Sequence, residues 1–316
     1  MDLSQGAGRE ACVVVNGKAG RGAARALGKL SESHLAQHGW RVALCVTERA
    51  DDELGFAAAH GAAQLFVVVG GDGTLRKVAQ GLGERGPRVA LGLVPVGNAN
   101  VVARELGLPL RDAAAAIELL TRGALLPFDV GEARPDARAP EPFLAMVGMG
   151  FDALTVCGLD RVRRTRLGER LYARGLSDVL YGVSATPAFF RLWPTRVRVT
   201  IGERTLAGHY PTVWICNTRT YAKGWSVTPA ARPDDGELDH HLCRRTLAPL
   251  VLWQLLHAMR GAPAPRFLGE YGRGTRYVLE GTRSFHWQLD GDPRPPATRL
   301  EVTVRPAALR LVGPAR

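Results

Sequence analysis

The chain has 316 residues, of which 46% are hydrophobic and 22% are charged. This is the composition of a globular protein with enough apolar surface for more than one core, and it excludes a disordered, collagen-like or coiled-coil chain. The net charge of +11 is uneven: residues 1–130 hold 14 Lys and Arg against 13 Asp and Glu, whereas residues 131–316 hold 27 against 17. Such an excess suits either an anionic partner or an ordinary solvated surface. Because no nucleic-acid-binding motif accompanies it, we expect no nucleic-acid partner.

The sequence predicts a cytoplasmic protein without a membrane span. The long uncharged stretch at residues 246–259 is too short to cross a bilayer and contains Pro249 and His257. The first residues lack the basic and apolar regions of a secretory signal. The five cysteines are scattered and form no C-x-x-C pair or Cys/His cluster in the sequence, so we expect reduced, buried thiols.

The first 130 residues alternate short apolar runs with helical patterns. We expect strands at 11–15, 40–46, 65–69 and 89–94, and helices at 21–37, 50–60, 74–82, 100–105 and 112–121. This alternation is typical of a parallel sheet with helices on both faces.

The second half has a different pattern. Residues 131–142 are rich in Pro, Arg and acidic residues, and we expect a turn or surface loop there. Strands are expected at 143–148, 196–201, 204–210, 212–217, 237–243, 275–280, 284–290, 299–304 and 308–312, and helices at about 164–186 and 247–260. The pattern favours a mostly antiparallel sandwich or barrel.

The most informative local motif follows the apolar strand at 65–69. The chain continues as Gly70, Gly71, Asp72, Gly73 and Thr74 and then enters a helix. Glycines let a backbone approach a ligand closely, and a helix start offers free N–H groups and a positive dipole end, which suit a phosphate. The Asp72 carboxylate can accept hydrogen bonds from a ribose or help to organise magnesium and phosphate.

Two further polar turns follow expected strands. One runs from Asn16 to Gly20, and the other contains Gly97, Asn98 and Asn100. Because the carboxyl ends of parallel strands share one edge of a sheet, we expect all three turns to lie together there and to form a nucleotide cradle.

Six motifs, in order, resemble those of the diacylglycerol-kinase catalytic family of lipid kinases, which includes bacterial lipid kinases and the sphingosine and ceramide kinases. They are residues 16–20 (N-P-x-[SA]-G in the family), 70–82 (GGDGTxNEVxNGL), 95–109 (P-x-G-[TS]-x-N-x-x-A-R-x-L-G-x-P), 148–153 (G-x-GFDA), 232–239 (P-x-D-G-x-L-D) and 288–292 (Q-x-DGE). The resemblance covers essentially the whole chain.

The resemblance implies an α/β plus β fold. Residues 1–130 would form a three-layer α/β nucleotide-binding domain like those of phosphofructokinases and NAD kinases. Residues 131–305 would form a mostly antiparallel β-sandwich for the lipid, and the final strands, about 305–316, would return to the first domain. ATP would bind in the cleft between the domains.

The resemblance also implies the chemistry. The γ-phosphate of ATP would pass, with Mg²⁺, to the hydroxyl of a membrane lipid, with diacylglycerol as the default acceptor and phosphatidic acid as the product. Asp290 would be the general base, with Asp72 as the competing candidate. Asp235 and Asp239 resemble a second acidic cluster that can hold Mg²⁺, although Asp-Asp-Gly is equally a turn sequence. Alternative functions are a sphingosine or ceramide kinase, an NAD kinase, and an inactive nucleotide-binding regulatory relative.

Five positions depart from the family motifs. Arg76 and Lys77 replace Asn-Glu, and we expect this pair to lie on an exposed helix face. Gly17 replaces Pro, Asn98 replaces Thr or Ser, and Asp292 replaces Glu. The Asn98 amide can still donate to a phosphate oxygen.

Residues 160–198 hold nine Arg against three acidic residues, interspersed with aromatic and aliphatic side chains. This mixture suits the headgroup region of an anionic membrane, and equally an ordinary amphipathic helix. For a lipid kinase the first interpretation places the protein peripherally at the inner face of the membrane. The sequence leaves open whether the chain forms a homodimer.

Overall fold

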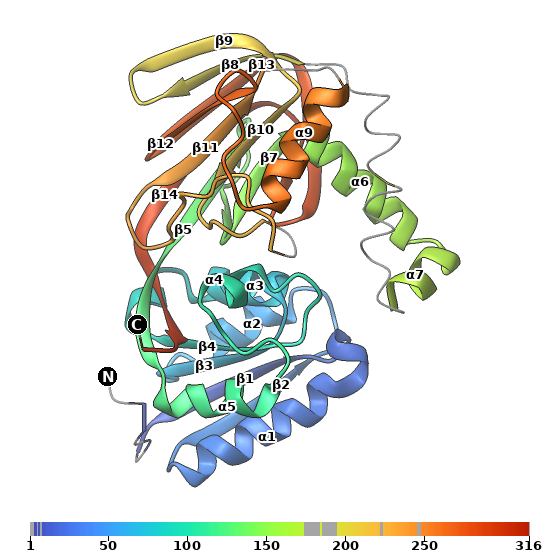
Figure 1. Ribbon diagram of the computed structural model, residues 1–316. Coiled ribbons are helices and arrows are strands. Elements are labelled where there is room, and N and C mark those ends of the chain that lie inside the picture. Colours follow the sequence, from blue (N-terminus) through green and yellow to red (C-terminus); the bar gives the residue numbers. More distant parts are fainter. Residues whose placement is uncertain are drawn as a thin grey trace. The chain divides into compact units, whose positions relative to one another are not determined.

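The computed structural model describes residues 3–4, 6, 8–173, 184, 195–221, 224–244 and 248–315. The chain divides into two compact units, whose elements are labelled in Figure 1. Unit 1 comprises Met1–Val130, Pro233–Asp235 and Arg305–Arg316, and unit 2 comprises Gly131–Arg232 and Gly236–Val304.

Unit 1 is an α/β structure, which confirms the predicted class. Its elements are β1 (Glu10–Asn16), the 3₁₀ turn η1 (Ala19–Gly22), α1 (Ala23–Gln37), β2 (Arg41–Thr47), α2 (Asp52–Ala59), β3 (Leu65–Gly70), α3 (Asp72–Leu82), the 3₁₀ segment η2 (Gly83–Arg88), β4 (Ala90–Pro95), α4 (Val101–Glu105) and α5 (Ala113–Arg122). The strands pair in parallel in the order β2-β1-β3-β4. In Figure 1, α1 and α5 cover one face of this sheet and α2, α3 and α4 cover the other.

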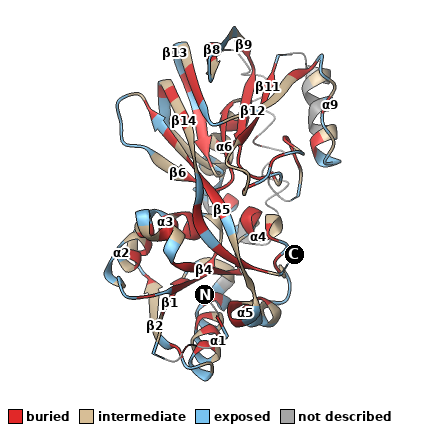
Figure 2. Ribbon diagram, turned by 90° about the vertical axis from the view of Figure 1, so that its left-hand side faces the viewer, coloured by how far each residue is buried: buried red, intermediate tan, exposed pale blue. Residues whose placement is uncertain are grey.

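Burial on both faces explains why the unit 1 strands are almost wholly apolar. Every residue of β3 and β4 is buried, as the red segments in Figure 2 show. Val13 and Val15 of β1 pack with Val67 and Val69 of β3 in the core beneath α1. The long strand β14 (Asp292–Gly313) extends the sheet, because its residue Arg310 pairs in parallel with Ala90 of β4.

Unit 2 is a mostly antiparallel β structure, also as predicted. Besides parts of β5 (Ala124–Pro135) and β14, its elements are β6 (Glu141–Phe143), β7 (Met146–Gly150), α6 (Phe151–Arg163), α7 (Arg166–Ala173), β8 (Thr195–Ile201), β9 (Arg204–Tyr210), β10 (Thr212–Cys216), β11 (Leu238–Cys243), α9 (Ala248–Met259), β12 (Gly269–Gly274) and β13 (Arg276–Leu289). The main strand order is β12-β11-β10-β7-β13, followed by β14, and β8 pairs with both β13 and β9. Aromatic side chains fill its core, among them Phe143, Tyr277, Phe285 and Trp287.

The turn or loop expected at 131–142 is confirmed only for residues 136–140, which connect two strands. Strand β5 continues to Pro135, and β6 begins at Glu141, so that Gly131 pairs with Phe143. A Cβ on Gly131 would overlap the Phe143 ring, so glycine serves here as a packing site in a strand and not as a turn residue. Pro135 is tolerated because it stands at the end of its strand, where it removes no central ladder bond.

Other boundaries in unit 2 also differ from expectation. Helix α6 begins directly after β7, because Gly150 takes φ +80° and turns the chain, whereas the sequence pattern predicted a helix only from about 164. The paired strands expected at 275–280 and 284–290 form the single strand β13, and those at 299–304 and 308–312 belong to β14. Residues 174–183 and 185–194, which carry most of the expected membrane-facing aromatics, lie outside the described residues.

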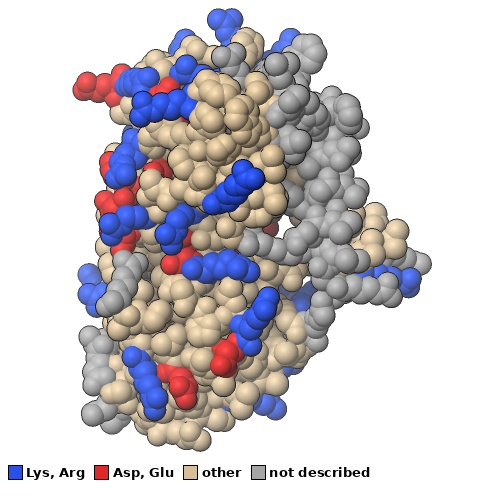
Figure 3. All heavy atoms as spheres, in the orientation of Figure 1, with Lys and Arg blue, Asp and Glu red and all other residues tan. Residues whose placement is uncertain are grey.

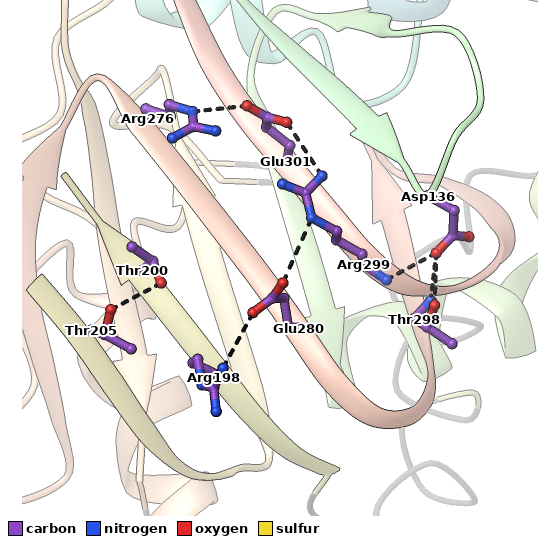
Figure 4. A network of polar contacts seen from close by, with 9 residues as sticks. All are labelled: Asp136, Arg198, Thr200, Thr205, Arg276, Glu280, Thr298, Arg299 and Glu301. Carbon is purple, nitrogen blue, oxygen red and sulfur yellow. Dashed lines mark hydrogen bonds and ion pairs between the residues drawn. The ribbon is translucent and has the colours of Figure 1, made fainter. Parts of the chain in front are cut away.

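Many arginines of unit 2 form ion pairs on its strands. Figure 4 shows Arg276 and Arg299 flanking Glu301, and Arg198 and Arg299 flanking Glu280. On the face shown in Figure 3, Lys and Arg are scattered and Asp and Glu lie among them. Exposed pairs of this kind contribute little stability each, but they neutralise part of the basic excess of this half of the chain. In the described part of the chain, no helix combines the length and the apolar character needed to cross a membrane.

Candidate functional site

The three polar turns of unit 1 meet at the carboxyl edge of its sheet. The Asn16 side-chain amide, after β1, donates to the Thr74 hydroxyl in the first turn of α3, with an N–O distance of 3.0 Å. Gly71 and Gly97 touch through their backbones, since a Cβ added to Gly97 would lie 2.7 Å from the Gly71 Cα. Gly20, at φ +60°, lies against Val96. The turns therefore form one continuous rim.

This rim lies at the point where the strand order changes direction. From β1 the chain passes to β2 on one side of the sheet, and from β3 it passes to β4 on the other. Loops that leave adjacent parallel strands in opposite directions open a crevice above the sheet, which is where such sheets bind ligands.

Gly73 and Asn98 are exposed members of the second and third turns, and Lys18 is exposed in the first. Gly73 stands in the first turn of α3, and a Cβ added there would meet no atom within 4 Å. It therefore contrasts with Gly71 and Gly97, where packing against the neighbouring turn requires glycine. Helix α3 has 11 residues and presents its free first-turn N–H groups at this open position. The rim thus fits a phosphate group on the side where Gly73 and Asn98 face solvent.

Asp72 holds the second and third turns together. Its two carboxylate oxygens accept hydrogen bonds from the Val101 and Val102 amides at the start of α4, both at 3.0 Å. Burial raises the pKa of the Asp72 carboxyl, and these amide donors oppose the rise. Asn100, which precedes α4 in the left-handed conformation at φ 48°, donates from its side-chain amide to the Gly97 carbonyl at 2.8 Å. Asp72 and Asn100 therefore fix the shape of the rim.

The expectation of an exposed Arg76–Lys77 pair is wrong for Arg76. Arg76 is only 5% exposed in α3. The Lys77 ammonium lies 3.1 Å from the Asp51 carboxylate and 3.7 Å from that of Glu53, beside α2. Because α3 packs along α2, the Lys77 side chain reaches the acidic residues beside α2 and its charge is paired there.

In unit 2, Asp290 lies in the tight turn between β13 and β14. Asp290 and Gly291 have φ values of 51° and 83°, as a two-residue hairpin requires. The Asp290 carboxylate accepts three backbone hydrogen bonds, from Leu144 at 2.9 Å, Ala145 at 2.8 Å and Met146 at 3.0 Å. These donors stabilise the ionised carboxylate and anchor the segment that leads into β7.

A second carboxylate lies behind this turn. Asp152, at the start of α6, is 1% exposed and accepts hydrogen bonds from the Tyr221 hydroxyl and, at 2.7 Å, from the Gln288 amide. Burial raises the pKa of Asp152, and these two donors oppose the rise. A Cβ on Gly148 would overlap the Asp152 carboxylate, so the motif at 148–153 needs glycine there. The sequence motifs pointed to Asp152 and Gln288 but gave no indication of Tyr221, which belongs to none of them.

The predicted magnesium ligands lie in separate units. Asp235 belongs to the segment Pro233–Asp235 of unit 1, and Asp239 is a buried residue of β11 in unit 2. Among the described residues, one group of three Cys, His, Asp or Glu side chains lies close enough together to share a metal ion. This group contains neither Asp235 nor Asp239. Their joint role as magnesium ligands stays a prediction.

Two family models match nearly the whole chain. The diacylglycerol kinase catalytic domain matches residues 10–133, and the YegS C-terminal NAD kinase beta sandwich-like domain matches residues 145–313. The chain is a lipid kinase of the diacylglycerol kinase and YegS family. The three turns of the rim lie in the first matched domain of this kinase, and Asp152, Gln288 and Asp290 lie in the second.

Curated relatives agree with this assignment. The kinase is 30% identical over 312 residues to a probable lipid kinase YegS-like protein of Pseudomonas putida, covering 98% of this chain and 96% of the relative. It is 29% identical over 248 residues to a diacylglycerol kinase of Mycobacterium tuberculosis, covering 78% and 76%. A crystal structure of a putative diacylglycerol kinase from Bacillus anthracis shares the fold, with a TM-score of 0.74 at 19% identity and 96% coverage of both chains.

Proposed function

We propose that this lipid kinase transfers the γ-phosphate of ATP, with Mg²⁺, to the hydroxyl of diacylglycerol and forms phosphatidic acid. The observation that carries the proposal is the meeting of the three turns around the start of α3 in a chain of this family. The relatives named diacylglycerol kinase support this acceptor over a sphingoid base or ceramide.

The rim would bind the nucleotide. The first amides of α3, at Gly73 and Thr74, would donate to phosphate oxygens, and the exposed Asn98 amide would donate to another. Gly70, Gly71, Gly97 and Gly20 would keep the backbones close enough to leave the phosphate side open. Asn16 and Asn100 would orient the turns through their side-chain hydrogen bonds.

Mg²⁺ fits the chemistry of this site because its preferred ligands are oxygens, most of them supplied by nucleotide phosphates and water. When bound, it would neutralise charge on the transferred phosphoryl group. Asp235 and Asp239 are the carboxylates we propose as its protein ligands. Lys77, by contrast, is paired with the carboxylates of Asp51 and Glu53 beside α2.

The acceptor hydroxyl needs a base, and we assign this role to Asp290. The amides of Leu144, Ala145 and Met146 fix the direction of this carboxylate, as a positioned base requires. The match of residues 288–292 to the family motif favours Asp290 over Asp72, and we propose that Asp72 positions the rim through its bonds to α4. Asp152 would support Asp290 through Gln288, whose carbonyl oxygen accepts from the Gly291 amide at 2.7 Å.

A water-insoluble acceptor requires the kinase to work at a membrane surface. We propose peripheral attachment through the basic second half of the chain, at the cytoplasmic face, with residues 1–130 as the nucleotide domain and the sandwich as the lipid domain. Vesicle binding should rise with the content of anionic lipid and fall with salt, because the attraction is electrostatic. Binding that responds to neither would remove this part of the proposal.

A lipid panel tests the reaction. The kinase is incubated with γ-labelled ATP, Mg²⁺ and micelles that contain diacylglycerol, monoacylglycerol, sphingosine or ceramide. We expect labelled phosphatidic acid as the main product, and no product without Mg²⁺. Label on sphingosine or ceramide instead would replace the acceptor, and failure to label any lipid would refute the proposal.

A further inference from the structure

A second group of reactive side chains lies in unit 1, outside the phosphate motifs. Cys12 of β1, Cys45 of β2 and His60 at the end of α2 offer ligand atoms that all lie within 4.8 Å of one another. The expectation that the chain has no Cys/His cluster is therefore wrong. These residues are separated by 33 and 15 positions, and only the pairing of β1 with β2 brings them together.

The sheet register explains the position of the two thiols. Cys12 pairs with Ala43, and Cys45 pairs with Val14, so the cysteines are diagonal neighbours on adjacent strands. The alternate residues Val13 and Leu44 pack into the core beneath α1. The cysteines therefore point to the opposite face, where α2 ends at His60.

Two of the three distances within the group are close to those of tetrahedral coordination, and the third, from the Cys12 sulfur to the His60 ring nitrogen, lies within 4.8 Å. The sulfur atoms of Cys12 and Cys45 are 3.8 Å apart, and the Cys45 sulfur is 3.8 Å from Nε2 of His60. A tetrahedral zinc ion with Zn–S bonds of about 2.3 Å and a Zn–N bond of about 2.0 Å separates two sulfurs by about 3.8 Å and a sulfur from a nitrogen by about 3.5 Å. The ligand atoms need to move by only a few tenths of an ångström at the Cys45–His60 edge.

His60 is held in the form that a metal ligand needs. Its Nδ1 lies 2.9 Å from the Phe56 carbonyl, which can only accept, so Nδ1 carries the proton and Nε2 presents its lone pair to the thiols. The Arg85 guanidinium donates to the carbonyls of Ala57, His60, Gly61 and Ala63 and so fixes the end of α2 around this residue. Two thiolates neutralise the charge of a zinc ion, so the nearby guanidinium does not oppose binding.

A pocket borders the group at His60. It has a volume of about 200 Å³ and is lined by Glu10, Ala43, His60 and Ala63 among others. Cys12 is fully buried, whereas Cys45 and His60 are half-buried. The group is therefore reached from the side of Cys45 and His60, and the pocket lies beside His60.

We propose that Cys12, Cys45 and His60 bind one zinc ion, with water as the fourth ligand. Two sulfurs and one imidazole in a tetrahedral arrangement select Zn²⁺ over Mg²⁺, which takes oxygen ligands, so this site is separate from any magnesium at the phosphates. The ion ties β1 and β2 to the end of α2, the helix that packs on α3. The proposal is independent of the lipid that the kinase phosphorylates.

Cobalt substitution tests the site directly. The full-length protein is reduced, freed of metal and titrated with Co²⁺, which shows intense visible absorption and a thiolate charge-transfer band only in a tetrahedral sulfur-containing site. We expect saturation at one equivalent and displacement of Co²⁺ by one equivalent of Zn²⁺. Cys45→Ser and His60→Gln should each weaken Zn²⁺ binding by about 100-fold or more, since each removes one of three protein ligands. Both side chains are half-buried, so these variants avoid the packing loss expected for Cys12→Ser.

Cys157→Ser is the matched control, because Cys157 is also half-buried but lies in α6 of unit 2. It should bind Zn²⁺ like the unmodified protein. A second readout is the melting temperature, which Zn²⁺ should raise in the unmodified and Cys157→Ser proteins but not in Cys45→Ser. The proposal is overturned if the reduced protein gives no tetrahedral Co²⁺ spectrum, or if Cys45→Ser binds as tightly as the control. It is also overturned if the two thiols prove to form a disulfide and the reduced form binds no metal.

Discussion

Removal of the Asp290 carboxylate should destabilise unit 2, apart from any effect on catalysis. The amides of Leu144, Ala145 and Met146 belong to buried residues and use this carboxylate as their acceptor. A hydrogen bond to a charged group contributes about 1.5–3 kcal/mol, and a buried amide left without an acceptor costs a similar amount. Because the three bonds share one half-buried side chain, we expect Asp290→Ala to lower the free energy of unfolding by about 4 kcal/mol.

Asp290→Asn should have a smaller effect. One oxygen remains and can accept from Ala145 and Met146, which share Oδ1 in the unmodified protein, while the new amide group meets the Leu144 N–H donor to donor. We expect a loss of about 2 kcal/mol for this variant. Asp292→Asn is the matched control two residues away, where the side chain is 51% exposed, and its effect should stay within about 0.5 kcal/mol.

The measurement is a urea titration followed by tryptophan fluorescence, since Trp287 lies fully buried in the unit 2 core. The same samples give kcat per folded molecule. If Asp290 is the base, Asp290→Asn should lose about 100-fold or more in kcat even where it is fully folded. Full activity of the folded Asn variant would refute the base assignment. An Asp290→Ala protein with the stability of the unmodified protein would refute the anchoring argument.

The other predictions concern the rim and unit 2. Asp72→Ala removes the acceptor of the first α4 amides, so it should lower the free energy of unfolding by about 1–2 kcal/mol. It should also speed amide hydrogen exchange at residues 101–102, and unchanged exchange there would contradict this prediction. Gly73→Ala should leave the melting temperature unchanged but raise KM for ATP, because its added Cβ meets no atom within 4 Å. Gly97→Ala should lower the melting temperature, because its added Cβ would lie 2.7 Å from the Gly71 Cα. Burial lowers the pKa of His240 to about 4 and that of His241 to about 3 from 6.5. Between pH 6.5 and 4, therefore, only the unfolded chain takes up protons at these two histidines. The free energy of unfolding should fall with falling pH by roughly 1.4 kcal/mol per histidine per pH unit, which urea midpoints would show. In His240→Gln this fall should be smaller, because one of the two histidines is gone.

The α/β unit could be predicted closely because its constraints are local. A strand buried on both faces must be an unbroken apolar run, as in Leu65–Gly70, and the turns that follow such strands need glycine or a capping side chain. The observed elements of unit 1 agree with the expected ranges within about two residues at most ends. The parallel arrangement then brings the turns at Asn16, Gly71 and Gly97 to one edge, whatever the side chains elsewhere.

The failures share a different cause. Pro135 and the arginines around it suggest a loop in isolation, but the pairing of β5 with β6 depends on a partner strand further along the chain. Arg76 is only 5% exposed although its helix pattern predicts an exposed face, and its helix packs along α2. The Cys12–Cys45–His60 group depends on the register of β1 against β2. In each case the decisive contact is between segments that no local pattern links.

The same distinction applies to the two acidic residues assigned to the chemistry. Sequence motifs single out Asp72 and Asp290 equally, yet the structure gives both carboxylates backbone amides from a different segment of their own unit: α4 for Asp72 and the start of β7 for Asp290. In each motif the carboxylate therefore has a structural role, because it fixes the backbone conformation of a neighbouring segment. A substitution at either position changes that conformation together with the charge, so loss of activity alone cannot assign a base. Only a comparison of kcat with folding stability in the same variant separates the two roles.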